Sequence, residues 1–300
     1  MTQQPIPWFD QALDTRERKI LTYDRHGIPG LRMIGCHNTS HATAPLPPHY
    51  HRDCFEFTYV VQGNLTFHVD HRRYDLSGGD LFLTFPDEIH DTGNAPMSLH
   101  RMYWFQLDVR CPEGMLGLEG AFARKLIAAL SGLDCRVVRM DPAAEGLFKA
   151  AFADLYGGDP LGRLRGSALL TAILCQILHD AALPGSRVSP DIARAAAYVR
   201  SHIHERITIE ELASEASLSA SRFKEKFKAQ MGTGPRNYIN YHKIQQAKAL
   251  LDQGWNVTDT AMALGFSGSD YFSVVFRRYT LLSPTEYQRR SRCAGEDAPR

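Results

Sequence analysis

The last third of the chain contains the same sequence pattern twice, and this duplication restricts its fold more than any other feature. Three positions recur 48 residues later, where Ala213, Leu218 and Ser219 become Ala261, Phe266 and Ser267. Four more recur 49 residues later, where Phe223, Phe227, Pro235 and Tyr238 become Phe272, Phe276, Pro284 and Tyr287. One inserted residue explains the change of spacing. A repeat of this length indicates two copies of one small structural unit.

Each copy is predicted to consist of a short helix, a turn, and a second helix that carries two aromatic residues four positions apart. The first helices are expected over Ile209–Glu215 and Val257–Leu264. The two turns differ, because Glu215–Ser217 contains no glycine, whereas Ala263–Gly265 ends on a residue that adopts positive φ freely. Two helices joined by a short turn form a helix-turn-helix, so the pattern predicts this unit twice.

The second helix of such a unit places its amino-terminal residues against base edges in the major groove, while basic side chains bind phosphates. In the first copy this helix starts after Ser219, a predicted N-cap. Lys224 and Glu225 can reach guanine and cytosine, and Lys228 can reach a phosphate. The second copy has fewer cations here, so we expect it to read fewer bases and bind more backbone. The predicted DNA-binding residues are Ser219, Ser221, Arg222, Lys224, Glu225, Lys228, Ser269, Asp270, Ser273, Val274, Arg277 and Arg278.

The distribution of charge supports a nucleic acid partner. The net charge of the whole chain is only +1. Residues 190–300, however, contain 16 Lys and Arg against 12 Asp and Glu, a net charge of +4, whereas residues 1–189 contain 18 against 21, a net charge of −3. The alternative is that the repeated helices only form a core and that their charged faces are solvated. Duplication within the basic part of the chain favours DNA binding.

The segment from about Pro190 to Arg290 resembles the DNA-binding domain of the AraC/XylS family of transcription regulators. The resemblance implies a helix from about Arg236 to Asp252 that joins the two units rigidly, so that both enter adjacent turns of one groove. Thr280–Leu282 departs from the family pattern, in which a glycine follows the threonine. The motifs that carry the resemblance are Ile209, Leu212 and Ala213, Ser219 to Phe227, Met231, Gly232, Pro235 and Tyr238, Ala261, Leu264 to Ser267, Tyr271 to Ser273, Phe276, Tyr279, and Ser283, Pro284, Glu286 and Tyr287.

The segment from about Leu31 to Asp108 has the pattern of a strand-rich module, in which short alternating apolar runs are separated by turn signals. Strands are expected over Phe55–Gln62, Asn64–Asp70, Leu81–Phe85 and Leu99–Asp108. The amino-acid sequence around these strands resembles the two motifs of the cupin barrel, although the second motif is one residue shorter than in cupin enzymes. The motif residues are His49, His51, Glu56, Gly63, Gly79, Asp80, Pro86 and His90.

Three interpretations of His49, His51, Glu56 and His90 are open. Imidazole and carboxylate ligands suit a divalent iron, manganese, nickel or zinc ion. The same groups could form a polar cup for the hydroxyls of a small effector, or they could be structural residues at the mouth of the barrel. Resemblance to the sugar-responsive AraC-type regulators favours the effector, a sugar or sugar-like metabolite, and no cofactor is predicted. Arg101 and Tyr103 share a strand face by period two and are predicted to extend this pocket.

Between Met115 and Ala182 the periodicity becomes helical, with Leu164, Ala168, Thr171, Cys175 and Leu178 on one face. Such a stripe packs against another surface, and we expect a second subunit. The predicted fold class is α+β, with a cupin-like β-barrel, then helices, then an all-α domain with two helix-turn-helix units. The predicted boundaries are 1–110 for effector binding, 111–183 for helical dimerisation, 184–190 for a linker and 191–292 for DNA binding.

The remaining features exclude several classes of protein. The longest apolar stretch, Ala168 to Leu178, has eleven residues, so no membrane partner is expected, and the first residues lack a secretory signal. The six cysteines include no C-x-x-C pair, which indicates free thiols in a cytoplasmic protein. We therefore expect a regulator and not an enzyme, with promoter DNA, an effector, a second copy of the chain and RNA polymerase as candidate partners. The alternative is a metal-dependent cupin enzyme fused to a DNA-binding domain.

Overall fold

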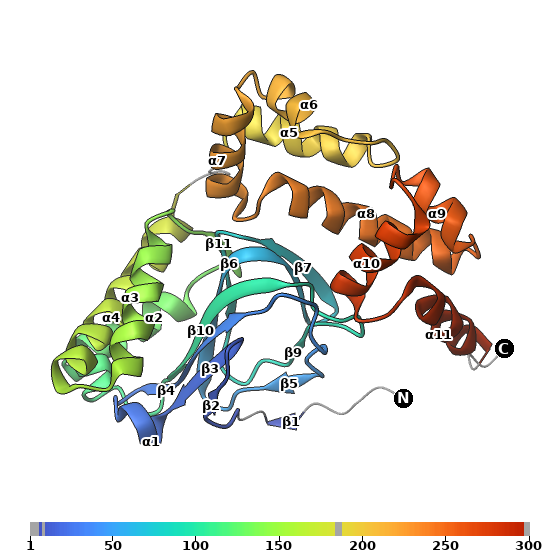
Figure 1. The fold of residues 1–300 in the computed structure, drawn as a ribbon. Helices are drawn as coiled ribbons and strands as arrows, with labels where there is room; N and C mark the ends of the chain where they lie inside the picture. The colour runs from blue at the N-terminus through green and yellow to red at the C-terminus, as the bar shows by residue number, and fades with distance from the viewer. Residues whose placement is uncertain (1–5, 8–9, 184–187, 297–300) are drawn as a thin grey trace. The chain divides into compact units, whose positions relative to one another are not determined.

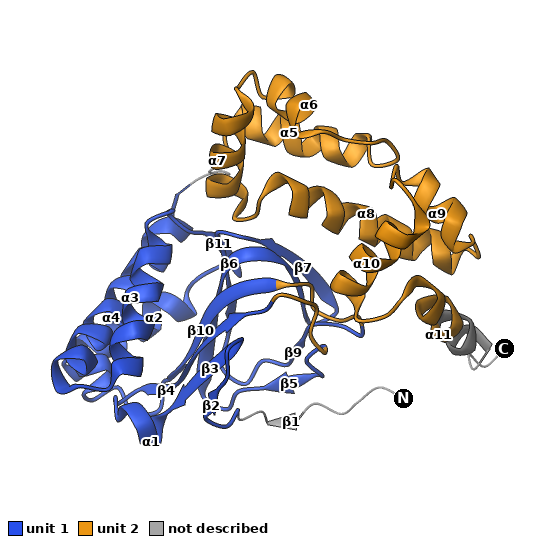
Figure 2. Ribbon diagram, viewed as in Figure 1, with its two compact units in different colours: residues 1–39, 45–94, 100–187 blue, residues 40–44, 95–99, 188–300 orange. Residues whose placement is uncertain are grey.

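The structure is a computed structural model that describes residues 6–7, 10–183 and 188–296, and the chain divides into two compact units (Figures 1 and 2). Strands and helices combine in the first unit and helices dominate the second, as the predicted α+β class requires. Residues 184–187 of the predicted linker lie outside the described residues. Unit 1 consists of Met1–Thr39, Pro45–Asn94 and His100–Arg187, and unit 2 of Ser40–Ala44, Ala95–Leu99 and Val188–Arg300.

The sheet of unit 1 curls into a half-barrel and is antiparallel except where its first strand pairs with its fifth (Figure 1). The strand order is β1-β5-β9-β6-β10-β4-β3-β2, with β7 and β8 also paired to β6 and β11 paired to β8. The strands are β1 (Ile6–Pro7), β2 (Leu13–Asp14), β3 (Arg18–Thr22), β4 (Leu31–Asn38), β5 (His49–Tyr50), β6 (Cys54–Val69), β7 (Arg72–Ser77), β8 (Asp80–Thr84), β9 (His90–Asp91), β10 (His100–Asp108) and β11 (Val137–Arg139).

Strand β6 differs from the prediction of two separate strands, Phe55–Gln62 and Asn64–Asp70. It runs unbroken for 16 residues, from Cys54 to Val69. Gly63 takes a φ of 101°, and the register of β10 against β6 shifts between Arg101 and Met102. A glycine and a register shift inside a strand mark a bulge, which bends the strand and increases its twist. The glycine that signals a turn in the sequence therefore curves the sheet.

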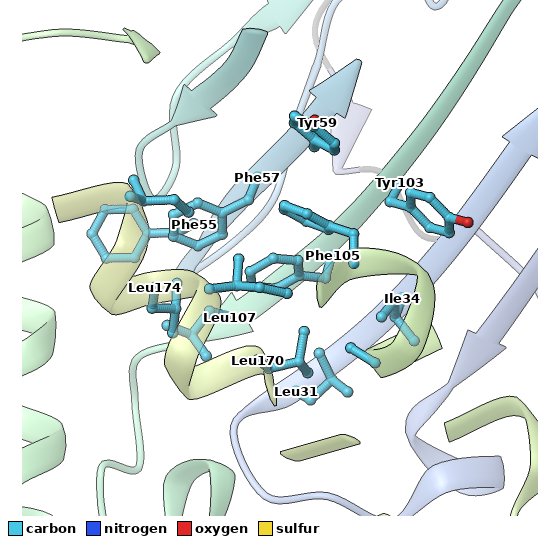
Figure 3. Packing of buried hydrophobic residues seen from close by; sticks show 14 of the residues in the cluster. Leu31, Ile34, Phe55, Phe57, Tyr59, Tyr103, Phe105, Leu107, Leu170 and Leu174 are labelled. Atoms are coloured by element: carbon cyan, nitrogen blue, oxygen red, sulfur yellow. The ribbon is translucent and has the colours of Figure 1, made fainter. Parts of the chain in front are cut away.

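The two faces of β6 and β10 have different surroundings because successive side chains point to opposite faces of a sheet. Phe55 and Phe57 of β6 and Phe105 and Leu107 of β10 are fully buried in the main core of unit 1 (Figure 3). The rings of Phe57 and Phe105 stack with their centroids 4.8 Å apart. The residues between them, including Glu56 on β6 and Gln106 on β10, belong to the opposite face, which forms the inside of the half-barrel.

Helices cover the outer face of the half-barrel and share its core. They are α1 (Tyr23–His26), a 3-10 turn η1 (Met115–Gly117), α2 (Gly120–Ser131), α3 (Ala144–Gly157) and α4 (Pro160–Ala181). Phe148 of α3 stacks on Tyr59 of β6 with a centroid separation of 4.6 Å. The predicted helical segment 111–183 is thus joined to the sheet through one apolar cluster.

Helix α4 has a buried and an exposed apolar face. Leu170, Ile173, Leu174 and Ile177 are fully buried in the core of unit 1. Among the described residues, α4 is long and apolar enough by length and composition to cross a membrane, which the eleven-residue stretch in the sequence did not suggest. Its buried face packs in the core of unit 1, and the core helix of a globular domain can have the same length and apolar composition.

Unit 2 contains the two predicted helix-turn-helix units. Its described helices are α5 (Pro190–Ser201), α6 (Ile209–Glu215), α7 (Ala220–Met231), α8 (Pro235–Asp252), α9 (Val257–Ala263), α10 (Ser269–Thr280) and α11 (Pro284–Glu296). The predicted helices over 209–215, 257–264 and 236–252 are confirmed to within one residue. Thr208 and Glu211 form a capping box that begins α6, and Ser219 caps α7 through the amide of Arg222.

Helix α8 packs in the cores of both helix-turn-helix units. Tyr238 and Ile239, near its amino end, pack with Phe223 and Phe227 of α7. Ile244 and Ala247, further along, pack in the second core with Phe272 and Phe276 of α10. One continuous helix therefore fixes the spacing of the two helix-turn-helix units, as the family resemblance implies.

Candidate DNA-binding helices and a buried histidine cluster

The outer face of α7 carries the predicted base-reading residues. Phe223 and Phe227 are fully buried, which turns the residues between and beside them outward. Lys226 is held back by Asp191 of α5, with 2.7 Å between its Nζ and Oδ2, so it does not belong to this face. The predicted residues of this copy, all exposed, are Ser219, Ser221, Arg222, Lys224, Glu225 and Lys228.

The corresponding face of α10 is less charged, as the sequence predicts. Asp270, Val274, Arg277 and Arg278 are exposed, and the two arginines lie near the carboxyl end of the helix. Ser269 and Ser273 are half-buried, and the Ser273 hydroxyl donates to the Ser269 carbonyl at 2.8 Å. Ser273 is thereby occupied within its own helix.

Tyr271 is a residue of this face that the sequence analysis did not select. Its side chain is 53% exposed, and it stands 49 residues after Arg222, at the matching position of the second copy. The 49-residue offset of the repeat, applied to Arg222, would have identified Tyr271 from the sequence. A phenol at this position can donate to a phosphate or pack against a base edge.

The two helix-turn-helix units are fastened together around Lys243 of α8. Its buried ammonium donates to the carbonyls of Glu205, at 2.7 Å, and Leu264, at 2.5 Å. Burial lowers the pKa of Lys243 to about 8. Glu205 precedes α6 of the first helix-turn-helix, and Leu264 follows α9 of the second helix-turn-helix. One side chain therefore ties both helix-turn-helix units to α8, the helix between them.

Four predicted residues of unit 1 meet inside the half-barrel. His49 of β5 and His90 of β9 are direct cross-strand partners, and their ring centroids are 4.2 Å apart. His51, just beyond β5, places its Nε2 3.0 Å from a carboxylate oxygen of Glu56 on β6, and the Nε2 of His90 lies 3.7 Å from the other oxygen. The structure brings His49, His51, Glu56 and His90 together, and we call these four residues the histidine cluster.

The cluster is almost fully buried, and burial affects the protonation of its side chains. His49, His51 and His90 are 1%, 3% and 1% exposed. Burial lowers the pKa of His49 to about 4, so that His49 is neutral at pH 7. Burial opposes ionisation of Glu56, but its interactions with His51 and, to a smaller extent, with His90 outweigh burial and hold the pKa of Glu56 well below its usual value. A carboxylate among imidazoles is the resulting arrangement.

Two of the three histidine rings, those of His49 and His90, are also oriented by backbone carbonyls. The Nδ1 of His49 lies 2.7 Å from the carbonyl of Pro47, and the Nδ1 of His90 lies 3.1 Å from the carbonyl of Glu88. A carbonyl only accepts hydrogen bonds, so both rings carry their proton on Nδ1 and direct the lone pair of Nε2 elsewhere.

Gln106 of β10 is the partner that the sequence analysis missed. Its amide Nε2 donates to Glu56 at 3.0 Å and lies 3.1 Å from the Nδ1 of His51. Period two along β10 separates Gln106 from Tyr103 and Phe105 and assigns it to the inner face. That alternation was visible in the sequence, but it does not reveal which face is the inside.

Arg101 and Tyr103 lie on the other face of β10, so the expectation that they extend the pocket is wrong. Arg101 pairs with Glu145 of α3 at 2.5 Å. Tyr103 is 8% exposed and belongs to the main core, with its ring near those of Phe148 and Phe152 of α3. The two residues do share a face, as predicted, but α3 covers that face.

Two family models match the chain. A model described as "AraC-like ligand binding domain" matches residues 34–174, which include the histidine cluster, α2, α3 and the first two thirds of α4. A model described as "Helix-turn-helix domain" matches residues 212–290, which include α7 to α10. The first match crosses the predicted boundary at residue 110, so the sheet and the helices that cover it fall within one domain model.

Known proteins of similar sequence are transcription regulators. The MmsAB operon regulatory protein of Pseudomonas aeruginosa is 34% identical over 223 residues, which cover 74% of this chain and 69% of that protein. The HTH-type transcriptional activator RhaR of Klebsiella pneumoniae is 27% identical over 274 residues, which cover 82% of this chain and 88% of that protein.

Solved structures match parts or most of the chain. The DNA-binding domain of AdpA, in complex with a target DNA, is 27% identical and covers 37% of this chain and 100% of its own, with a TM-score of 0.35. ToxT from Vibrio cholerae is 11% identical and covers 91% of this chain and 98% of its own, with a TM-score of 0.33.

These matches confirm the predicted family and answer the question of enzyme or regulator. The family and the similar proteins are DNA-binding regulators and not enzymes, so the alternative of a metal-dependent cupin enzyme does not apply. Ligand-binding and helix-turn-helix domains stand in the order that the sequence analysis expected. The chain belongs to the AraC family of DNA-binding transcription regulators.

Proposed function

We propose that this protein is a cytoplasmic, one-component transcription factor that reads a specific promoter sequence through α7 and α10 and responds to a small effector bound by unit 1. One observation carries the proposal: two helices with the same buried aromatic pair expose polar and basic faces, and α8 packs in the cores of both. The cations on the first of these faces, Arg222, Lys224 and Lys228, match base edges and phosphates.

The expected footprint follows from the length of α8. Its 18 residues span about 27 Å, somewhat less than the roughly 34 Å of one turn of B-DNA. The two helices of one chain would therefore enter the major groove on the same side of the duplex, about one turn apart. RNA polymerase bound beside such a site is the partner through which a regulator of this kind would act.

The effector is proposed to be a small, hydroxyl-rich metabolite, with sugars and sugar acids as the first class to test. The inner face of the half-barrel offers groups of the right kind, since histidines and a carboxylate exchange hydrogen bonds with hydroxyls. The four clustered side chains contact one another closely, so a sugar would meet the cluster at its edge, where the Glu56 side chain retains 12% exposure. Regulation then requires that the effector bind the DNA-competent state more tightly than the other state.

The exposed face of α4 supports a homodimer. Leu161 and Leu164 are 76% and 68% exposed, and Ala168 and Cys175 continue the same stripe toward the end of the helix. Thr171 and Leu178, the other predicted members of the stripe, are half-buried. Apolar residues at helical spacing that remain exposed in one chain mark a surface that a second chain can cover.

Cysteine cross-linking tests this dimer directly. If the stripes of two chains pack about a two-fold axis near Cys175, mild oxidation links the two thiols, and Leu164→Asp abolishes both the link and the dimer in sedimentation. Cys111 is also exposed, so the measurement uses the Cys111→Ser chain as its background. A dimer that survives Leu164→Asp would place the subunit interface elsewhere.

Selection from a random DNA library with the full chain tests the DNA-binding proposal. A true operator should then outcompete unrelated DNA by about a thousandfold or more. Equal competition by unrelated DNA would contradict the proposal and would indicate a protein that only coats DNA. A thermal-shift screen of sugars and sugar acids on the same protein identifies the effector, because a ligand bound by the folded state raises its apparent stability.

A further inference from the structure

The two helix-turn-helix units are joined at a second place, away from the axis of α8. The loop 202–208 connects α5 to α6, and its buried Ile203 anchors it in the core of the first helix-turn-helix. This loop reaches the turn Ala263–Gly265 of the second helix-turn-helix (Figure 1). A Cβ added to Gly265 would lie 2.7 Å from the backbone nitrogen of Arg206, so the backbones of the loop and the turn are in direct contact.

Lys243 of α8 binds both sides of this contact. Its Nζ donates to the carbonyl of Glu205 in the loop at 2.7 Å and to the carbonyl of Leu264 in the turn at 2.5 Å. The ammonium also lies 5.5 Å from the centroid of the Phe266 ring, within the range of a cation–π interaction. The loop, the turn and α8 therefore meet at one side chain, and we call this arrangement the Lys243 link.

The burial of this ammonium indicates that its hydrogen bonds matter. Lys243 is 4% exposed, and a charged group taken from water costs free energy unless hydrogen bonds replace the lost water. Ile239 and Ala247 lie four residues before and after it, on the same face of α8, one in each of the two cores. An apolar side chain at position 243 would pack between these cores without the cost of the charge. What only the lysine supplies is a directional bond to two backbones, which favours one arrangement of the packed elements.

A helix by itself fixes two attached units less precisely than DNA requires. Long helices curve gently, so units held only by α8 could tilt relative to one another as the helix bends. Each added base pair moves a point in the major groove by about 3.4 Å along the duplex and rotates it by about 35°. A second connection beside α8 opposes the tilt, because the two units are then held at two separate places.

We propose that Lys243 is a positioning residue that holds α7 and α10 at the one spacing and rotation that an operator must match. The proposal rests on the proposed function in taking α7 and α10 as the helices that bind two segments of one DNA. It assigns no DNA contact to Lys243. Loss of the ammonium should therefore leave the base preference of each helix unchanged and widen the range of spacings that the chain accepts.

A series of operators with altered spacing tests the proposal. The two segments of a selected operator are moved together or apart by one and two base pairs, and the affinity of the full chain is measured by fluorescence anisotropy. The unaltered chain should lose at least about tenfold in affinity for a change of one base pair, because linked binding modules gain affinity only when both can engage. Lys243→Met should lose less than about threefold over the same change.

Lys226→Met is the matched control, because it makes the same substitution at a lysine whose ammonium binds Asp191 of α5. It should keep the narrow spacing profile of the unaltered chain. An operator with a scrambled second segment shows whether Lys243→Met folds, since its α7 should bind that operator as tightly as the unaltered chain does. A defect of folding alone would weaken binding at every spacing by the same factor and leave the profile narrow.

A second variant guards against loss of the fold, because Lys243→Met leaves two carbonyls without their donor. Insertion of two glycines between Glu205 and Arg206, which are both exposed, lengthens the loop and keeps Lys243 in place. This chain should show the same widened profile. A narrow profile in both altered chains, or a wide profile in the unaltered chain, would overturn the proposal.

Hydrogen exchange without DNA separates this proposal from the proposed function. Peptides that cover 202–208 and 263–266 should exchange faster in Lys243→Met, while peptides that cover α7 should not change. Faster exchange in a chain that prefers no DNA sequence would refute the DNA-binding function, and with it the role in spacing, but not the Lys243 link itself. Unchanged exchange in a chain that binds its operator would refute only the positioning role.

Discussion

Ser217 and Gly265 occupy the same position in the turns of the two helix-turn-helix units, with φ angles of 56° and 62°. The sequence suggested different turns, because only the second contains a glycine. The structure gives both turns the same left-handed residue. A serine in this conformation is strained, since its Cβ approaches the following carbonyl, whereas a glycine is not.

Ser217→Gly should therefore stabilise unit 2 by about 0.5–1 kcal/mol, the relief of strain being partly offset by the greater freedom of glycine in the unfolded chain. Ser217 is exposed, so the change removes little packing. Urea denaturation followed by circular dichroism measures the difference, and Ser217→Ala, which keeps a Cβ, is the control that should show no gain. A loss of stability in Ser217→Gly would mean that the serine hydroxyl matters more than the backbone strain.

Gly265→Ala should have the opposite effect and cost at least about 2 kcal/mol. A Cβ at this position would lie 2.7 Å from the backbone nitrogen of Arg206 and from the carbonyl carbon of Glu205. Neither backbone atom can move without displacing the segment that Lys243 ties to the second helix-turn-helix. The same urea titration measures the loss of stability. Near-normal stability would show that the two helix-turn-helix units are not in close contact at this turn.

Lys224→Ala and Glu225→Ala should each change base preference at single operator positions and cost about 1–3 kcal/mol there. The reason is that both side chains are exposed on the half of α7 that we propose faces the bases. Lys226→Ala is the matched control in the same helix, because it removes the same charge as Lys224→Ala but its ammonium already binds Asp191. Binding to operators with each base substituted in turn distinguishes the variants. Equal weakening for every sequence would show that Lys224 contacts phosphate.

Lys228→Ala should weaken binding to all sequences alike and lower the salt dependence by about one released counterion, a change of about 0.9 in the slope of log K against log salt. Lys228 is exposed in the last turn of α7, where a phosphate is the expected partner. Fluorescence anisotropy over a series of KCl concentrations gives the slope. An unchanged slope would remove Lys228 from the DNA interface.

His26 of α1 should make unit 1 less stable in mild acid. The side chain is 1% exposed, its Nδ1 accepts from the amide of Ile28 at 3.1 Å, and burial lowers its pKa from 6.5 to about 4. Below pH 6.5 the unfolded state takes up a proton that the folded state refuses, so the stability falls as the pH drops from 6.5 toward 4. The full effect is on the order of 3 kcal/mol.

Comparison with His26→Gln isolates this contribution, because burial also lowers the pKa of His49 to about 4 and the pKa of His37 below its usual value. Urea denaturation at pH 7 and pH 5 measures both proteins. The variant should lose less stability between these values than the unaltered chain. Identical pH dependence would mean that His26 is not deprotonated by burial in the folded protein.

The helical part of the fold followed from the sequence because its signals are local. Thr208, Ser219 and Asn256 cap the predicted helices through their own side chains, and the aromatic pairs set the buried face of α7 and α10. The sheet was less predictable, since Gly63 could end a strand or bend one, and only pairing with β10 decides between them. Arg101 and Tyr103 were given the right common face, but the identity of the inner face depends on α3, which is distant in the sequence.

The histidine cluster was predictable as a set of residues but not as an arrangement. The spacing of His49, His51, Glu56 and His90 indicated that they could meet, and they do. The contacts of Pro47 and Glu88 that orient the rings come from backbone carbonyls, which leave no mark in the side-chain sequence.

The central claim is that two helices of one chain read two segments of the major groove at a spacing set by α8. Insertion of five base pairs between the two segments of a selected operator tests this directly, because the insertion rotates one segment by about half a turn of the duplex. The affinity of the full chain should then fall to that of an operator in which the second segment is scrambled. Undiminished affinity after the insertion would contradict the claim, since the two helices would then not be reading DNA as one rigid pair.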